Sequence, residues 1–112
     1  MNNKYRKLLL NECPNLYKSY ETIVEEQFEL FAKKQLDYGI GNISTGANLE
    51  TKEGKDFALH GLWFRMNDKI SRWKNLIIKN RKGNNETLID TYQDLGNYSI
   101  ICQLINRGLW KE

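Results

Sequence analysis

The sequence has little cysteine, histidine and proline, and the first two shortages exclude whole classes of protein. Its 112 residues contain two cysteines, one histidine and one proline. Cys13 and Cys102 are too few for the disulfide framework of a small secreted domain, and we expect both to be reduced thiols. Because His60 is the only histidine, a Cys/His zinc site would lack ligands.

Long hydrophobic runs are also absent from the sequence. No apolar run approaches the ~20 residues that span a bilayer, and the leucines near the N-terminus form too short a core for a secretory signal. We therefore expect a cytoplasmic protein. Hydrophobic residues make up 40% and charged residues 28% of the chain, which is typical of a globular protein. The length fits one helical domain over residues 1–112.

What the sequence does contain is helical periodicity in three long segments. Apolar residues recur at helical spacing over about 15–36, 56–80 and 86–110, and residues 1–13 predict a short additional helix. The fold class is therefore all-α, with three main helices in a small antiparallel bundle. The apolar stripes exceed what three helices bury, so we expect a dimer or a higher oligomer. The predicted core stripes of the second and third helices are Leu62, Met66, Ile70, Trp73 and Ile77, and Leu88, Tyr92, Leu95, Ser99 and Cys102.

Residues 40–56 separate the first and second predicted helices and are rich in Gly, Asn, Ser and Thr. This composition predicts a loop without regular structure. Loops of this length are usually functional or mobile. Two interpretations of this segment are therefore possible: a mobile surface loop, and a loop that closes over a binding site.

Charge is divided between the second and third predicted helices. The second carries a mainly basic polar row of Arg65, Asp68, Lys69 and Arg72. The third carries Glu86, Asp90 and Asp94 at i, i+4, i+8, and this acidic row is expected to point inward. In one interpretation, salt bridges between the rows join two antiparallel helices. In the other, the three carboxylates hold Mg²⁺ through oxygen ligands while the basic row contacts phosphates.

Aromatic residues suggest where a nucleobase would stack. Tyr38 is the best candidate because it follows Asp37 at the end of the first helix, beside the Gly-rich segment. Aromatic residues at helical spacing are more often part of a core. His60 is better interpreted as a surface residue than as a general base.

Three separated blocks of the sequence combine charged and aromatic residues at fixed spacings. They are Lys34-x-x-Asp37-Tyr38-Gly39, Arg65-x-x-Asp68-Lys69-Ile70-x-Arg72-x-x-Asn75-Leu76 and Glu86-x-x-x-Asp90-Thr91-x-x-Asp94-Leu95-x-x-Tyr98. Over about residues 28–105 this pattern resembles the nucleotide modification associated domain 1 family, a set of small, mainly phage-encoded helical proteins. The resemblance implies a role in nucleotide metabolism or modification in phages, without a defined reaction.

A wider likeness is to the all-α nucleotide pyrophosphohydrolases of the MazG and dimeric dUTPase type. Their E-x-x-E and E-x-x-D pairs hold magnesium at a triphosphate. Glu26-x-x-Glu29 and Glu53-x-x-Asp56 satisfy these letters. The second pair falls in the predicted 40–56 loop instead of on a helix, which argues against metal-dependent hydrolysis.

The leading hypothesis is a phage-type protein that binds a nucleotide, either for its modification or to sequester a host nucleotide signal as an anti-defence protein. Two alternatives stay open: a Mg²⁺-dependent nucleoside triphosphate pyrophosphohydrolase, and a helical module for protein interaction. No membrane or specific duplex nucleic acid is expected as a partner. The residues expected to bind nucleotide or phosphate are Lys34, Asp37, Tyr38, Arg65, Lys69, Arg72 and Tyr98, and those expected to bind metal are Glu86, Asp90 and Asp94.

Overall fold

The computed structural model describes residues 2–79 and 87–112, and within these ranges the chain forms five helices and no strand. The predicted all-α class is confirmed, and so is the short N-terminal helix. No helix in the described ranges is long and apolar enough to cross a membrane. The helices are α1 (Lys4–Glu12), α2 (Pro14–Tyr38), α3 (Gly41–Ser44), α4 (Lys52–Lys79) and α5 (Leu88–Asn106).

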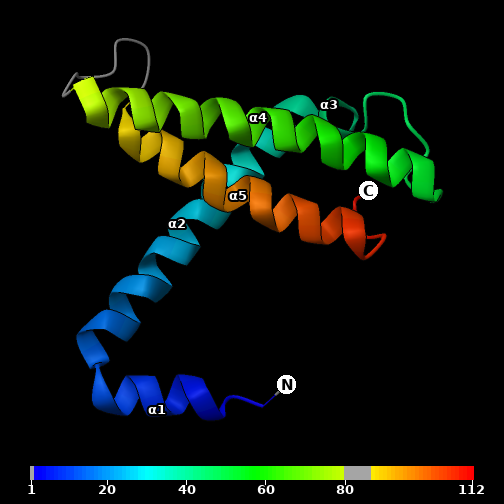
Figure 1. Ribbon diagram of the computed structural model, residues 1–112. Helices are drawn as coiled ribbons and strands as arrows, with labels where there is room; N and C mark the ends of the chain where they lie inside the picture. Colours follow the sequence, from blue (N-terminus) through cyan, green and yellow to red (C-terminus); the bar gives the residue numbers. More distant parts are fainter. Residues whose placement is uncertain (1, 80–86) are drawn as a thin grey trace.

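The antiparallel pair of α4 and α5 forms the centre of the molecule. These helices lie side by side and run in opposite directions, α3 packs on α4, and α2 contacts α5 (Figure 1). Gly96 lies at the contact of α2 with α5, where a β-carbon would be 2.7 Å from the side-chain amide nitrogen of Gln27. Asn97, which is buried, then donates to the Gln27 carbonyl at 3.4 Å and fixes the crossing.

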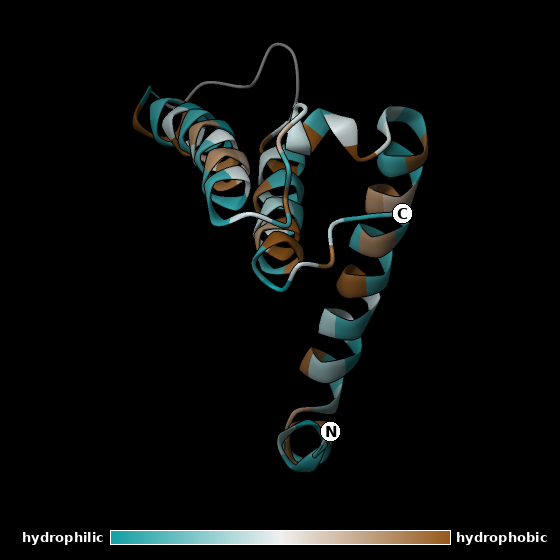
Figure 2. Cartoon of the chain, turned by 90° about the vertical axis from the view of Figure 1, so that its right-hand side faces the viewer, coloured by the Kyte–Doolittle hydropathy of each residue, from teal (hydrophilic) through white to brown (hydrophobic). Residues whose placement is uncertain are grey.

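The molecule is more open than the predicted bundle. Its radius of gyration is 16.7 Å, whereas a compact domain of this length has about 13 Å. The N-terminal part of α2 projects away from the α4–α5 pair and carries α1 at its end, and hydrophobic stretches run along this free part (Figure 2). A three-helix arrangement therefore exists only around the C-terminal part of α2.

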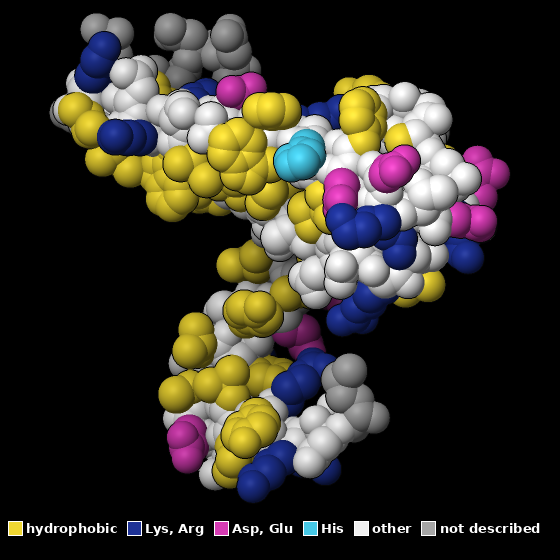
Figure 3. Space-filling model, turned by 45° about the vertical axis from the view of Figure 1, so that its right-hand side comes forward, with side chains coloured by type: hydrophobic (Ala, Val, Ile, Leu, Met, Phe, Trp, Pro, Cys, Tyr) yellow, Lys and Arg dark blue, Asp and Glu magenta, His cyan; other side chains and the backbone are white. Residues whose placement is uncertain are grey.

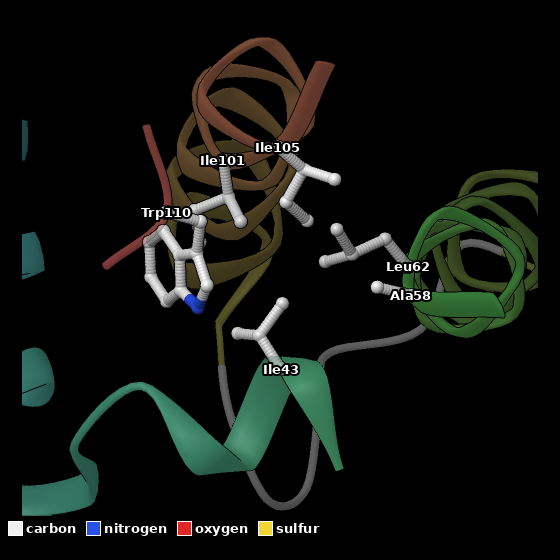
Figure 4. Packing of buried hydrophobic residues seen from close by; sticks show 6 residues of the cluster. All are labelled: Ile43, Ala58, Leu62, Ile101, Ile105 and Trp110. Atoms are coloured by element: carbon white, nitrogen blue, oxygen red, sulfur yellow. The ribbon is translucent and has the colours of Figure 1, made fainter. Parts of the chain in front are cut away.

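The hydrophobic core lies where α3, α4, α5 and the C-terminal segment meet (Figure 4). The indole of Trp110 donates to the Ile40 carbonyl at 3.1 Å, so the end of the chain is attached to the segment before α3. The buried cluster consists of Ile43, Ala58, Leu62, Ile101, Ile105 and Trp110.

The predicted core stripes were partly wrong. On α4, Leu62 is buried, but Ile70 and Ile77 are exposed, because the helix turns a different face, ending in buried Leu76, toward α5. On α5 the buried face carries Thr91, Asn97, Ile101 and Ile105. Ile101 and Ile105 continue the acidic row along the same side of α5. The side that carries this row is therefore the inward face of the helix.

The 40–56 segment is more regular than its composition predicts. Gly41–Ser44 is helical and contributes Ile43 to the core, and α4 begins at Lys52 instead of Asp56 or Phe57. The hydroxyl of Thr51 accepts from the Gly54 N–H at 3.0 Å, which is how a threonine caps a helix N-terminus. Gly54 is required there because a β-carbon would collide with the Asn48 carbonyl.

The cap of α5 also differs from the prediction. From the sequence alone, the segment Arg81-Lys82-Gly83-Asn84-Asn85 predicts Asn84 or Asn85 as the N-cap of this helix, and both lie outside the described residues. Thr87 is the N-cap: its hydroxyl accepts from the Asp90 N–H at 3.3 Å, and the Asp90 carboxylate accepts from the Thr87 N–H at 3.1 Å. This reciprocal capping box satisfies two backbone donors of the first turn.

Candidate functional site

A polar cavity of about 340 Å³ lies between the C-terminal half of α2 and the helices α3, α4 and α5. Its volume is within the range of small-molecule sites. Each of four helices contributes at least one residue, so the cavity exists only in the folded chain. It is lined by Phe31, Lys34, Gln35, Tyr38, Asn42, Ile43, Arg65, Asp94, Asn97, Tyr98 and Ile101.

Asp94 joins three helices at one edge of this cavity. One carboxylate oxygen lies 3.0 Å from Nζ of Lys34 on α2, and the other lies 3.0 Å from Nζ of Lys69 on α4. The acidic row of α5 thus meets the basic row of α4, as the inward-pointing row implies. Because both partners are cations, Asp94 holds their ammonium groups on either side of itself.

Arg65 lines the cavity from the side of α4. Its Nη2 donates to the backbone carbonyl of Asn42 at 2.8 Å, so it also attaches α3 to α4. A guanidinium carries five N–H donors in one plane and forms bidentate bonds with phosphate and carboxylate groups. Lys34 and Arg65 are two lining cations against one lining carboxylate, Asp94, and this balance suits an anionic ligand.

Two buried polar atoms of the cavity residues have no hydrogen-bond partner within the described part of the chain. They are the amide nitrogen of Gln35 and the amide oxygen of Asn42. An unpaired buried polar group costs about 1–3 kcal/mol, so it calls for a physical reason. A ligand with a hydrogen-bond acceptor and a donor would satisfy both atoms. Sequence reasoning missed both residues, although Gln35 lies on the helical face of Phe31 and Tyr38.

Two tyrosines that the sequence singled out border the same cavity. Tyr98 is half-buried on α5, and Tyr38 is 66% exposed at the end of α2, just before Gly39, whose φ of 71° ends the helix. The ring of Tyr38 is therefore accessible at the rim.

The other predicted binding residues lie outside the cavity wall. Asp37 is exposed on α2 and is not among the lining residues. Lys69 lies behind Asp94, and Arg72 donates to the Thr91 hydroxyl at 2.7 Å and to the Thr87 carbonyl at 3.4 Å. Lys69 and Arg72 therefore join α4 to α5 in this structure.

The predicted metal ligands do not form a common set in the described structure. Glu86 lies outside the described residues, Asp90 is engaged in the helix cap, and Asp94 is engaged by two lysines. Within the described ranges no group of three or more His, Cys, Asp or Glu side chains is arranged to hold a metal ion. Binding of Mg²⁺ stays a prediction.

The E-x-x-D pair requires a correction. Glu53 and Asp56 lie in the first turns of α4, so the argument that this pair falls in a loop was wrong. Asp56 binds Lys52 at 2.8 Å on the exposed surface, and this hydrogen bond lowers the pKa of its carboxyl group. Glu26 and Glu29 are exposed on α2. The four carboxylates match the residue types of the pattern, but no group of three or more possible metal ligands forms among the described residues.

No family model matches the chain, and no curated protein or solved structure is significantly similar to it. The likeness to the nucleotide modification associated family consequently depends on the motif residues alone. Of these residues, Lys34, Tyr38, Arg65, Asp94 and Tyr98 border one cavity.

Proposed function

We propose that this chain is a nucleotide-binding protein and that its ligand occupies the cavity between α2, α3, α4 and α5. The observation that carries the proposal is the presence of two unpaired buried polar atoms, on Gln35 and Asn42, in the same cavity as Lys34 and Arg65. Cations bind the phosphate, and the unpaired amides bind the remainder of the ligand. Among the described residues, the indole nitrogen of Trp73 on α4 is unpaired as well and does not line the cavity, so the support comes from the position of the two amides beside Lys34 and Arg65.

In this proposal Lys34 and Arg65 bind the phosphate. Arg65 provides planar N–H donors in a fixed position, because its bond to the Asn42 carbonyl holds the guanidinium against α3. Lys34 provides an adjustable point charge. Asp94 positions Lys34 and is itself held by Lys69 at 3.0 Å. Lys69 thus supports the site without lining it.

The base is bound by stacking and by the two amides. Tyr38 at the rim and Tyr98 in the wall supply aromatic surface, and stacking on an aromatic side chain contributes about 1–3 kcal/mol per base. The edge of a nucleobase presents donors and acceptors side by side. This edge complements the amide nitrogen of Gln35 and the amide oxygen of Asn42.

We further propose that the nucleotide is retained without turnover, as in a phage-type protein that sequesters a host nucleotide signal in the cytoplasm. This choice is supported by the engagement of Asp90 in a helix cap and of Asp94 by two lysines. Neither carboxylate is arranged to activate water. Modification of the bound nucleotide and Mg²⁺-dependent release of pyrophosphate are the alternatives that the experiment distinguishes.

The test is a thermal-shift screen with mono-, di-, tri- and cyclic nucleotides, with and without Mg²⁺, followed by assays for pyrophosphate and for altered nucleotide. A ligand at 100 times its dissociation constant stabilises the fold by about 2.7 kcal/mol, which corresponds to roughly 10 °C for a domain of this size. We expect at least one nucleotide to do so and to be recovered unchanged. If no nucleotide shifts the transition, the proposal is wrong.

A matched pair of variants assigns the binding to this cavity. Lys34→Gln removes a lining cation, whereas Lys33→Gln makes the same change at the adjacent exposed position, which is not among the lining residues. We expect Lys34→Gln to weaken the binding about tenfold or more, as for the loss of a charge-assisted hydrogen bond. Lys33→Gln should bind like the natural chain. Equal affinities of the two variants would assign the ligand to another surface.

A further inference from the structure

Helix α1 and the N-terminal half of α2 form an arm, whereas the C-terminal half of α2 packs against the core through Phe31. Neither α1 (Lys4–Glu12) nor α2 (Pro14–Tyr38) contains a buried residue. Isolated helices shorter than about 12–15 residues are marginal in water. The nine-residue helix α1 is fastened to α2 mainly by Arg6, which donates to the Tyr17 hydroxyl at 2.9 Å and pairs with Glu21 at 3.4 Å. Because this contact is exposed, it contributes little to the stability of α1 within a single chain.

The arm nevertheless carries a continuous apolar surface, which we name the arm face. On α2 its members recur at the spacing of an amphipathic helix that packs against a partner. Ile23 is 54% exposed and Phe28 is 67% exposed, far above the values for a core stripe. Hydrophobic side chains gather on the arm in the space-filling view (Figure 3). The arm face consists of Leu9, Leu16, Tyr20, Ile23, Val24 and Phe28.

The exposed area indicates how much surface is left without a partner. The chain exposes 9011 Å², whereas a folded monomer of 13.2 kDa exposes about 6,400 Å² by the usual scaling with mass. The excess is about 2,600 Å². Obligate homodimers bury about 1,000–2,500 Å² on each chain. The surplus is therefore of the size that a stable dimer covers.

We propose that a second copy of this chain packs on the arm face. The interface is isologous, so the arm of each copy contacts the arm of the other. Arg6 and Glu21 already pair within one chain. The charges left on the arm still suit the association of two copies, because α1 carries Lys4 and Lys7 and α2 carries Glu25 and Glu26. A basic α1 of one copy lies beside the acidic flank of α2 of the other.

A second exposed apolar surface on α4 is the competing place for the partner. It includes Trp63, Ile70 and Ile77. The arm is preferred because α4 already buries Gly54, Ala58, Leu62 and Leu76 in its own chain, whereas α1 and α2 bury none. The stability of α4 is thus explained within one copy. That of the arm is not.

The test compares two adjacent substitutions on α2. Ile23→Lys introduces a charge into the arm face, and Thr22→Lys introduces the same side chain at an exposed position on the opposite side of the helix. Mass is measured by light scattering and sedimentation over a range of concentrations. We expect about twice 13.2 kDa for the natural chain and for Thr22→Lys, and the single-chain mass for Ile23→Lys.

Two results of the mass measurements would overturn the proposal. One is a natural chain that stays at 13.2 kDa at all concentrations. The other is a chain with Ile23→Lys that associates as strongly as the chain with Thr22→Lys, together with a chain with Ile70→Lys that dissociates. This combination would assign the interface to α4. Amide hydrogen exchange in the natural chain supplies a readout without substitution. Protection across residues 14–28 should rise with protein concentration, and constant protection would contradict the proposal.

Discussion

Asp94 on α5 and Lys69 on α4 form an ion pair of 3.0 Å whose side chains are only 13% and 21% exposed. Asp94 also binds Lys34, so one carboxylate lies between two ammonium groups. Its removal leaves two like charges facing each other, one of them largely shielded from water. The pair therefore predicts a measurable loss of stability when the carboxylate is neutralised.

We expect Asp94→Asn to lower the free energy of unfolding by about 2 kcal/mol, which is below the loss for a fully buried pair because Lys34 reaches solvent. The measurement is urea unfolding followed by circular dichroism. Asp37→Asn makes the same chemical change at an exposed position of α2 and should change stability by less than about 0.5 kcal/mol. Equal losses in the two variants would mean that the Asp94 pairs add nothing specific.

Gln35 allows stability and binding to be separated. Its amide nitrogen is buried without a partner, so Gln35→Leu removes an unsatisfied group and keeps a good helix former. We expect unfolding stability to stay equal or rise by up to about 1 kcal/mol, while nucleotide affinity falls. Gln103→Leu, at an exposed site on α5, serves as the control for added hydrophobicity. A loss of stability in Gln35→Leu, with binding unchanged, would contradict the assigned role of this amide.

The charge pattern predicted the meeting of α4 and α5 correctly, because i, i+4, i+8 spacing fixes which residues share a row. Asp94 and Lys69 are in contact as that row requires. The pattern did not indicate which face of α4 turns toward α5. Ile70 and Ile77 are as hydrophobic as Leu62, and only the crossing of the helices leaves them exposed.

Residue composition misled the prediction for the 40–56 segment. Gly and Asn are typical of loops, yet Thr51 caps α4 and Gly54 fits against the Asn48 carbonyl. A threonine followed by Glu53 in the first turn is a signal that sequence reading had available. The unpaired amides of Gln35 and Asn42 had no such signal, because burial without a partner is a property of the assembled helices.

Asp90 tests the prediction of a metal site directly. Its carboxylate accepts from the Thr87 N–H at 3.1 Å, so Asp90→Ala should cost about 1 kcal/mol of stability, as for the loss of a helix cap. Thr87→Ala should cost a similar amount, and the double variant should lose less than the sum because both belong to one capping box. Nucleotide binding, with or without Mg²⁺, should be unchanged in Asp90→Ala. A loss of binding confined to the Mg²⁺ samples would instead assign Asp90 to a metal.

The thiol of Cys102 provides a probe of the packing of α5 that depends on pH. Desolvation by burial raises the pKa of this thiol above its ordinary value of 9.0. In the Cys13→Ser chain, which leaves Cys102 alone, we expect alkylation at pH 8 to be several-fold slower than in urea, since both access and the thiolate fraction are reduced. The alkylation rate should rise with pH, and its midpoint should lie at a higher pH in the folded chain than in the unfolded chain.

The same shift has a defined sign for stability. Folding favours the protonated thiol of Cys102. The contribution of this thiol to the free energy of unfolding is therefore complete below its pKa in the unfolded chain, and it decreases as the pH rises toward its pKa in the folded chain. Urea unfolding of the Cys13→Ser chain should therefore show a small loss of stability above about pH 9 that Cys102→Ala abolishes. Alkylation of Cys102 at the same rate and with the same pH midpoint in folded and unfolded chains would show that α5 does not shield this position.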